Sequence, residues 1–353
     1  MERIEGDTFY LAPDLRGHTT PWFYWYFEVS GAAGKQLTFV LDPEKIGVRG
    51  PAVSFDRGVH WQWLGADAVR NGAFRFYFSG TPVRFSVGMP YVLENWERFA
   101  CRIGDRVVPE QLTVTPAGRP VPLLKMGNPA ASWCVALLAR HHACEMMGSY
   151  LLEGVIEGVL QDTPEGEWLR NHVSFFVVPF MDLDGVERGD QGKNRAPHDP
   201  NRDYAGDSIY AEVRAVKEQL PGWQAGRRLI VLDLHNPALA GPYHESIFFL
   251  EPEHRGQARE LDQFLASLLE VNQGPIPLRE PYKLAFGCGF NGIPAASRKT
   301  CSTWMSHLPN VIFAASLEIA YANAGGSEVN AETARGFGRD LARALWHRLS
   351  QGG

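Results

Sequence analysis

The stretch LIVLDLHNP, residues 229–237, decides the fold of most of this chain. Its apolar residues from Leu229 to Leu234 are nearly continuous, which is typical of a strand buried on both faces. Three similar apolar runs occur at residues 133–138, 173–179 and 311–317. We therefore expect four buried strands of one sheet.

Helical patterns separate these strands and follow the last of them. They are predicted at residues 146–160, 211–219, 255–271 and 331–349. Strands that alternate with helices predict an α/β domain with a largely parallel sheet. In such sheets the chemistry gathers at the carboxyl ends of the strands.

The first part of the chain has a different pattern. Short aromatic and β-branched runs, such as residues 22–29, 36–41 and 74–78, are separated by turn residues without a helical stretch. This pattern favours an all-β sandwich. Since 353 residues exceed one ordinary core, we expect two domains, at residues 1–112 and 113–353.

Composition excludes several classes of function. A formal net charge of -6 gives no basic stripe for nucleic acid, and no apolar run is long enough to span a membrane. The five cysteines are odd in number and contain no CxxC pair, so they predict no disulfide framework. The first ten residues lack the apolar core of a signal peptide. The expected compartment is the cytosol.

Polar clusters lie at the ends of three of the predicted strands. His142 and Glu145, three residues apart, follow the strand at residues 133–138 and can converge on one ion. His235 follows the strand at residues 229–234. Each residue alone fits an ordinary surface or capping role. Together, two imidazoles and one carboxylate leave one position of a catalytic zinc open. Glu318 lies between apolar residues at the end of the strand at residues 311–317, where a carboxylate is costly unless it has a partner or a function. It is a candidate general base.

Further polar motifs lie between these clusters, Asp184-Gly185 and Asp199-Pro200-Asn201-Arg202. Taken in order with the three clusters, they resemble the M14 metallocarboxypeptidase family over about residues 115–350. The aromatic front part resembles the cytosolic carboxypeptidase subfamily, which includes enzymes that remove glutamates from protein tails.

This resemblance implies an α/β/α domain with a central mixed sheet, preceded by the β-sandwich. It implies one zinc ion held by His142, Glu145 and His235, with Glu318 accepting a proton from the attacking water. Asp199 would orient His142.

The resemblance also assigns the substrate contacts. Asn201 and Arg202 would hold the substrate's terminal carboxylate. A basic residue between Gly185 and Asn201 should stabilise the oxyanion. The candidates are Arg188, Lys193 and Arg195, of which Arg195 is favoured, then Lys193. Arg298 lies in the region that shapes the specificity pocket, where a cation would favour acidic side chains, although a solvated basic loop explains it equally well.

We therefore expect a cytosolic enzyme that removes a C-terminal residue from a peptide or a protein tail, without nucleic-acid or membrane partners. Three alternatives stay open: a zinc amidohydrolase for small N-acyl amino acids, a binding protein whose catalytic fold has lost activity, and a front domain that delivers the hydrolase to a protein partner. His141 is interpreted as a neighbour of the site and Cys144 as a buried thiol beneath it.

Overall fold

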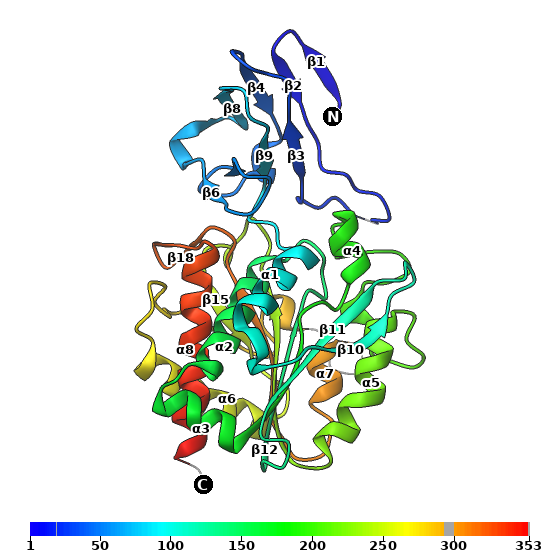
Figure 1. The fold of residues 1–353 in the computed structure, drawn as a ribbon, viewed down its shortest axis with the longest axis vertical. Coiled ribbons are helices and arrows are strands. Elements are labelled where there is room, and N and C mark those ends of the chain that lie inside the picture. The colour runs from blue at the N-terminus through cyan, green and yellow to red at the C-terminus, as the bar shows by residue number, and fades with distance from the viewer. Residues whose placement is uncertain (19, 293–299, 352–353) are drawn as a thin grey trace.

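An eight-stranded mixed sheet forms the centre of the larger part of the molecule (Figure 1). The computed structural model describes residues 1–18, 20–292 and 300–351. The strand order is β10 (Glu110–Val114), β11 (Pro120–Gly127), β13 (Val173–Val178), β12 (Trp133–Ala139), β14 (Arg228–His235), β17 (Val311–Ile319), β15 (Ile247–Leu250) and β16 (Lys283–Leu284). The four central strands, β13, β12, β14 and β17, run parallel, whereas β10, β11 and β15 join by antiparallel pairs. The expected mixed sheet is confirmed.

Helices cover both faces of this sheet. On one side lie α2 (Met147–Leu160), α3 (Pro164–His172), α6 (Arg255–Val271) and α8 (Ala331–Ser350), and on the other α4 (Leu183–Arg188), α5 (Ala211–Gln224) and α7 (Cys301–Met305) (Figure 1). Helices α2 and α8 approach closely. A Cβ at Gly154 would overlap the carbonyl oxygen of Arg335, so only glycine fits at this contact. None of the described helices is long and apolar enough to cross a membrane.

The register of the central strands brings their polar ends to one edge of the sheet. Every residue of β12 and β13 is buried, as a sheet covered on both faces requires. Ala139 of β12 lies opposite Leu234 of β14, and His235 lies opposite Glu318 of β17. The candidate residues that follow three separate apolar runs therefore meet.

Two small sheets form the β part, which lies above the α/β part in Figure 1. One has the order β1 (Arg3–Glu5), β2 (Thr8–Tyr10), β4 (Gln36–Val40), β8 (Ala73–Tyr77) and β7 (Val69–Arg70); the other has β3 (Tyr26–Val29), β9 (Val83–Ser86), β5 (Ala52–Ser54) and β6 (Gln62–Trp63). Phe39, Phe74 and Phe85 pack between them, with ring centroids 5.2–5.6 Å apart. This aromatic core agrees with the predicted sandwich.

The prediction that this first part contains no helix is wrong. Residues Leu93–Ile103 form α1, in which Trp96 and Phe99, three residues apart, are buried. That spacing places both rings on one helical face, while charged residues occupy the opposite face. Strand β10 of the large sheet already begins at Glu110, and the division at residue 112 stays a prediction.

Candidate active site

Two consecutive histidines, His141 and His142, follow a turn at the end of β12 and point to different partners. Arg140 has a φ of 64°, in the left-handed region that costs a residue with a side chain energy. Its buried guanidinium donates to the carbonyl oxygens of Tyr91, at 2.6 Å, and of Ala143, which holds the turn in place. As a result, His142 turns toward Glu145 and His141 turns toward Asp233.

The three predicted metal ligands converge at one point. Nδ1 of His142 lies 2.7 Å from Oε1 of Glu145, and Nδ1 of His235 lies 2.6 Å from Oε2 of the same carboxylate. The candidate ligand atoms of the three residues all lie within 4.8 Å of one another, and all three side chains are buried. Two imidazole nitrogens and a carboxylate oxygen facing one space suit a zinc ion with an open position.

Electrostatics in this cluster are strongly coupled. Burial alone would raise the pKa of Glu145, but His142, Lys193 and His235 hold it well below its usual range. Burial would lower the pKa of His235, but the carboxylates of Asp233 and Glu145 raise it well above the usual value. A cation in this space is therefore favoured by the carboxylate and must displace a proton from the imidazole.

The outer nitrogens of the two histidines face other carboxylates. Nε2 of His142 lies 3.5 Å from Oδ1 of Asp199, within ion-pair distance, and among the described residues neither atom has a hydrogen-bond partner. Asp199 was predicted for this place. Nε2 of His235 lies 2.8 Å from Oδ2 of Asp233, a residue whose role the sequence interpretation missed. The alternation of Asp233 and His235 along one strand was the available signal, since such residues share a face.

Glu318 faces the same space from β17. Its side chain is only 6% exposed, and within the described part of the chain Oε2 has no hydrogen-bond partner. Burial raises the pKa of Glu318; His235 counteracts this and Glu145 adds to it. A buried carboxylate with an open acceptor beside a metal site is suited to general-base chemistry.

The structure separates the two favoured candidates for the oxyanion role. Lys193 lies at the cavity, with Nζ 3.3 Å from Oε1 of Glu145 and 5.4 Å from the ring centre of Trp22. Arg195 instead forms a bidentate ion pair with Asp182, at 2.8 and 3.1 Å, and also contacts Asp190. The geometry thus brings Lys193, and not Arg195, toward the cluster of His142, Glu145 and His235, here called the metal cluster.

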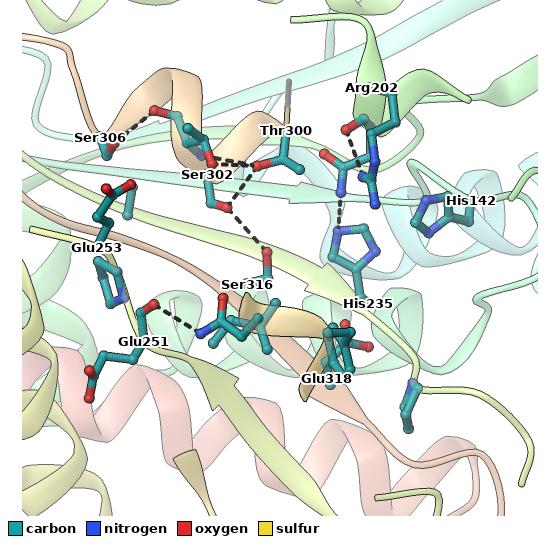
Figure 2. Close-up of a pocket in the computed structure, with 18 of the residues that line it drawn as sticks. His142, Arg202, His235, Glu251, Glu253, Thr300, Ser302, Ser306, Ser316 and Glu318 are labelled. Carbon is teal, nitrogen blue, oxygen red and sulfur yellow. Dashed lines mark hydrogen bonds between the residues drawn. The ribbon is translucent and has the colours of Figure 1, made fainter. Parts of the chain in front are cut away.

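A cavity of about 370 Å³ opens beside these residues (Figure 2). In Figure 2, His142 and His235 lie on the right of the cavity, and Ser302, Ser306 and Glu253 lie on its left. The hydroxyl-bearing residues of the wall are Thr300, Ser302, Thr303, Ser306 and Ser316. Two carboxylates, Glu251 and Glu253, also line it, and Glu251 pairs with Lys283 at 2.7 Å. Arg298 lies outside the described residues.

The two predicted carboxylate-binding residues occupy different positions. Arg202 is exposed and lines the cavity, and its side chain donates to the carbonyl oxygen of Asn201 at 3.0 Å. The amide of Asn201 is buried: its oxygen accepts from the backbone N–H of Cys301 at 2.9 Å, and its nitrogen lies 3.1 Å from Nε2 of His235. Asn201 thereby connects α7 to the metal cluster.

The β part contributes a residue that was expected in a strand of the sandwich. Trp22 lines the cavity beside Lys193. The expected strand at residues 22–29 is formed only from Tyr26 to Val29, so Trp22 extends toward the α/β part. Gln191 supports this approach through hydrogen bonds with the backbone of Tyr24.

Comparisons with known proteins find similarity to zinc carboxypeptidases. The family model for zinc carboxypeptidases (peptidase M14) matches residues 92–227. Human cytosolic carboxypeptidase 2 is 36% identical over 95 residues, covering 25% of this chain and 10% of that protein. Cytosolic carboxypeptidase 6 of Caenorhabditis elegans is 27% identical over 179 residues, covering 46% of this chain and 39% of that protein. The chain thus spans well under half the length of these relatives.

Solved structures match over nearly the whole chain. A metallo-carboxypeptidase from Burkholderia cenocepacia has a TM-score of 0.77 at 20% identity, covering 96% of this chain and 93% of that one. A metallo-carboxypeptidase from Pseudomonas aeruginosa has a TM-score of 0.79 at 19% identity, covering 99% and 96%. At these identities the likeness shows a shared fold, including the β part. The family model and the partial relatives are thus similar to this chain over part of its length, and the solved structures share its fold; all of them are carboxypeptidases by name.

Proposed function

We propose that this protein is a zinc carboxypeptidase that removes one residue from the C-terminus of a peptide or a protein tail. The family implies zinc, and His142, Glu145 and His235 form the candidate site. The observation that carries the proposal is the convergence of two imidazole Nδ1 atoms on the Glu145 carboxylate, beside Glu318 at the wall of an open cavity. We assign one zinc ion to this site.

The bound zinc would polarise the scissile carbonyl and activate water. Glu318 takes the proton of the attacking water and passes it to the leaving amine. The ammonium of Lys193 faces the negative charge that develops on the carbonyl oxygen. Trp22 and Glu145 hold Lys193 in place, so this charge needs little reorganisation when the reaction occurs.

Selection of a terminal residue rests on Arg202. Its exposed guanidinium borders the cavity and provides a planar fork for the substrate's terminal carboxylate. Asn201 supports the loop through its contact with Cys301 rather than through a free amide. An amidated or extended C-terminus offers no carboxylate at this position, which would restrict the reaction to the last residue.

The preference for an acidic side chain stays a prediction. It depends on Arg298, and the described wall offers hydroxyl groups and the carboxylates Glu251 and Glu253. The hydroxyl groups of the wall support a polar side chain. A screen of peptides ending in Glu, Lys, Leu and D-amino acids, with N-acyl amino acids as the alternative class, tests this directly.

The decisive experiment measures bound zinc and then peptide hydrolysis by Glu318→Gln. We expect about one zinc per chain and a loss in rate of about 10²–10⁴-fold with zinc retained, since that is the usual contribution of a general base. Glu212→Gln is the matched control, because Glu212 is also a buried glutamate but lies outside the cavity. Near-normal hydrolysis by Glu318→Gln, or a wild-type protein that binds no zinc, contradicts the proposal.

A further inference from the structure

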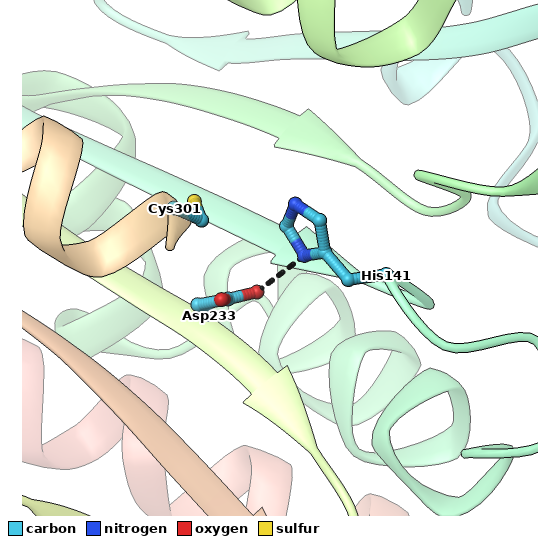
Figure 3. A group of neighbouring side chains, drawn as sticks. All are labelled: His141, Asp233 and Cys301. Atoms are coloured by element: carbon cyan, nitrogen blue, oxygen red, sulfur yellow. Dashed lines mark hydrogen bonds and ion pairs between the residues drawn. The ribbon is translucent and has the colours of Figure 1, made fainter. Parts of the chain in front are cut away.

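A second buried cluster adjoins the metal cluster and is not used by the proposed reaction. It consists of His141 after β12, Asp233 in β14 and Cys301 at the start of α7 (Figure 3). All three side chains are inaccessible to solvent. A buried carboxylate is costly without partners, so the contacts of Asp233 need an explanation.

Hydrogen bonds link this cluster to the metal ligand His235 in a continuous chain. The hydroxyl of Tyr204 lies 2.7 Å from Nε2 of His141, and Nδ1 of His141 lies 2.7 Å from Oδ1 of Asp233. The other oxygen of Asp233 lies 2.8 Å from Nε2 of His235. Nδ1 of His235 then faces Glu145.

The chemistry of the groups fixes the direction of every bond. An ionised carboxylate only accepts, so both histidines donate a proton to Asp233, from Nδ1 of His141 and from Nε2 of His235. The remaining nitrogen of His141 then accepts from the Tyr204 hydroxyl. Burial raises the pKa of Tyr204 well above the usual value, which keeps that hydroxyl protonated. When a metal replaces the proton on Nδ1 of His235, the proton on Nε2 stays with Asp233, and the free lone pair is on Nδ1, the nitrogen that faces Glu145 and the metal space.

One competing donor has to be considered. The amide nitrogen of Asn201 lies 3.1 Å from Nε2 of His235, a geometry that by itself favours an accepting Nε2. That arrangement would leave Asp233 facing a lone pair at 2.8 Å without a proton between them. Since the charged partner makes the shorter and stronger bond, the proton on Nε2 belongs to the contact with Asp233.

We propose that Asp233, supported by His141 and Tyr204, is a positioning residue that holds His235 in the tautomer and orientation that bind the metal. This inference rests on the proposed function, because it assigns the metal to the His142–Glu145–His235 site. It also gives His141 a role other than that of an adjacent side chain.

The alternative role for the same residues is a second metal site. Both ring nitrogens of His141 already have partners, and the Cys301 thiol lies 3.9 Å from the Met305 sulfur. Burial and the nearby Asp233 charge raise the pKa of Cys301 well above its usual value, which disfavours the thiolate that metals require. The hydrogen-bonded chain therefore explains the cluster better than a second ion does.

The test compares zinc affinity in metal-free protein titrated against a competing chelator. Asp233→Asn keeps the shape but replaces an acceptor with an amide that can donate to Nε2 and drive the proton to Nδ1; we expect zinc affinity to fall about 10–100-fold. Tyr204→Phe removes one hydroxyl at the far end of the chain, and we expect a smaller fall of about two- to tenfold. Cys301→Ser is the control, because it changes the neighbouring thiol but keeps His141, Asp233 and Tyr204, and its zinc affinity should equal that of the wild type.

Melting temperatures of the metal-free variants separate positioning from folding. A purely structural role would lower the melting temperature without weakening zinc binding, and this result overturns the inference. Zinc affinities within twofold of wild type in both Asp233→Asn and Tyr204→Phe also overturn it, and Tyr204→Phe alone decides if Asp233→Asn does not fold. Two zinc ions per wild-type chain, one of them lost in Cys301→Ser, would show a second metal site instead. A wild type without zinc refutes the proposed function, whereas unchanged variants refute only this inference.

Discussion

Two histidines that are neighbours in the sequence have opposite environments in the structure. His142 joins Glu145 and His235 at the wall of an open cavity, whereas His141 joins Asp233 and Tyr204 in a closed, fully buried cluster. Both clusters contain imidazole and carboxylate groups near the ends of the same strands. The difference shows that residue types alone do not define a metal site. A ligand also needs an unused lone pair and access to an open space.

The basic residues near the site repeat this lesson. Lys193 and Arg195 are two positions apart, yet Lys193 reaches Glu145 and Arg195 is held by Asp182. A guanidinium that is already paired with a bidentate carboxylate interacts only weakly with negative charge on a reaction intermediate. The position of Lys193 makes it our proposal for the oxyanion role.

The largest effect is expected when a ligand of the open cluster is removed. His142→Ala removes one of three protein ligands, and we expect zinc affinity to fall by more than about 100-fold, beyond the effect of losing an orienting partner. Metal content after dialysis against a weak chelator measures this loss. His172→Ala, on the exposed end of α3, is the control and should retain wild-type zinc content. Full zinc content in His142→Ala would remove His142 from the ligand set.

The next effect distinguishes the two cations. Lys193→Met should lower kcat by about 10²–10³-fold, the usual cost of losing an oxyanion donor, with the melting temperature little changed. Arg195→Met should leave the Asp182 carboxylate buried without its partner and destabilise the fold by about 3–5 kcal/mol. Steady-state kinetics and thermal unfolding of both variants measure the pair. The reverse pattern would return the oxyanion role to Arg195.

A smaller effect concerns recognition of the terminal carboxylate. Arg202→Lys keeps a positive charge but loses the planar fork, and we expect KM to rise about 10-fold, as for the loss of a charged hydrogen bond. Amidated peptides provide the matched control, since the wild type should process them poorly and the variant should discriminate less. Equal KM values for wild type and variant on free peptides would exclude Arg202 from carboxylate binding.

The smallest effect uses a buried carboxylate outside both clusters. Burial raises the pKa of Glu212 from 4.5 to about 7, and its carboxylate accepts from the backbone N–H of Leu183. Because the folded pKa is the higher one, the unfolded state ionises first, and stability is lost as pH rises from about 4.5 to about 7. The loss should approach about 3 kcal/mol.

Glu212→Gln should therefore remove this part of the pH dependence. Chemical denaturation at pH 4.5 and pH 8 should show a stability difference between variant and wild type that favours the variant only at the higher pH. A difference that does not change with pH would show that Glu212 is not protonated in the folded protein. Asp233, by contrast, has two histidine partners and remains ionised.

The sequence by itself determined the core of the fold and the main site. Four apolar runs became the parallel strands β12, β13, β14 and β17, because continuous apolar residues of this length are stable only between two helical layers. Since parallel strands end at one edge, the polar residues after them had to meet. The convergence of His142, Glu145, His235 and Glu318 follows from that rule.

Only the tertiary structure decided which neighbouring residues share this site. The left-handed turn at Arg140 sends His141 and His142 to different clusters, and pairing with Asp182 withdraws Arg195. Trp22 of the β part lines the cavity of the α/β part. These outcomes depend on backbone angles, on ion pairs between distant segments and on packing between the two parts of the molecule. Periodicity and spacing contain no information on such contacts, because they describe what one segment can form and not what it meets.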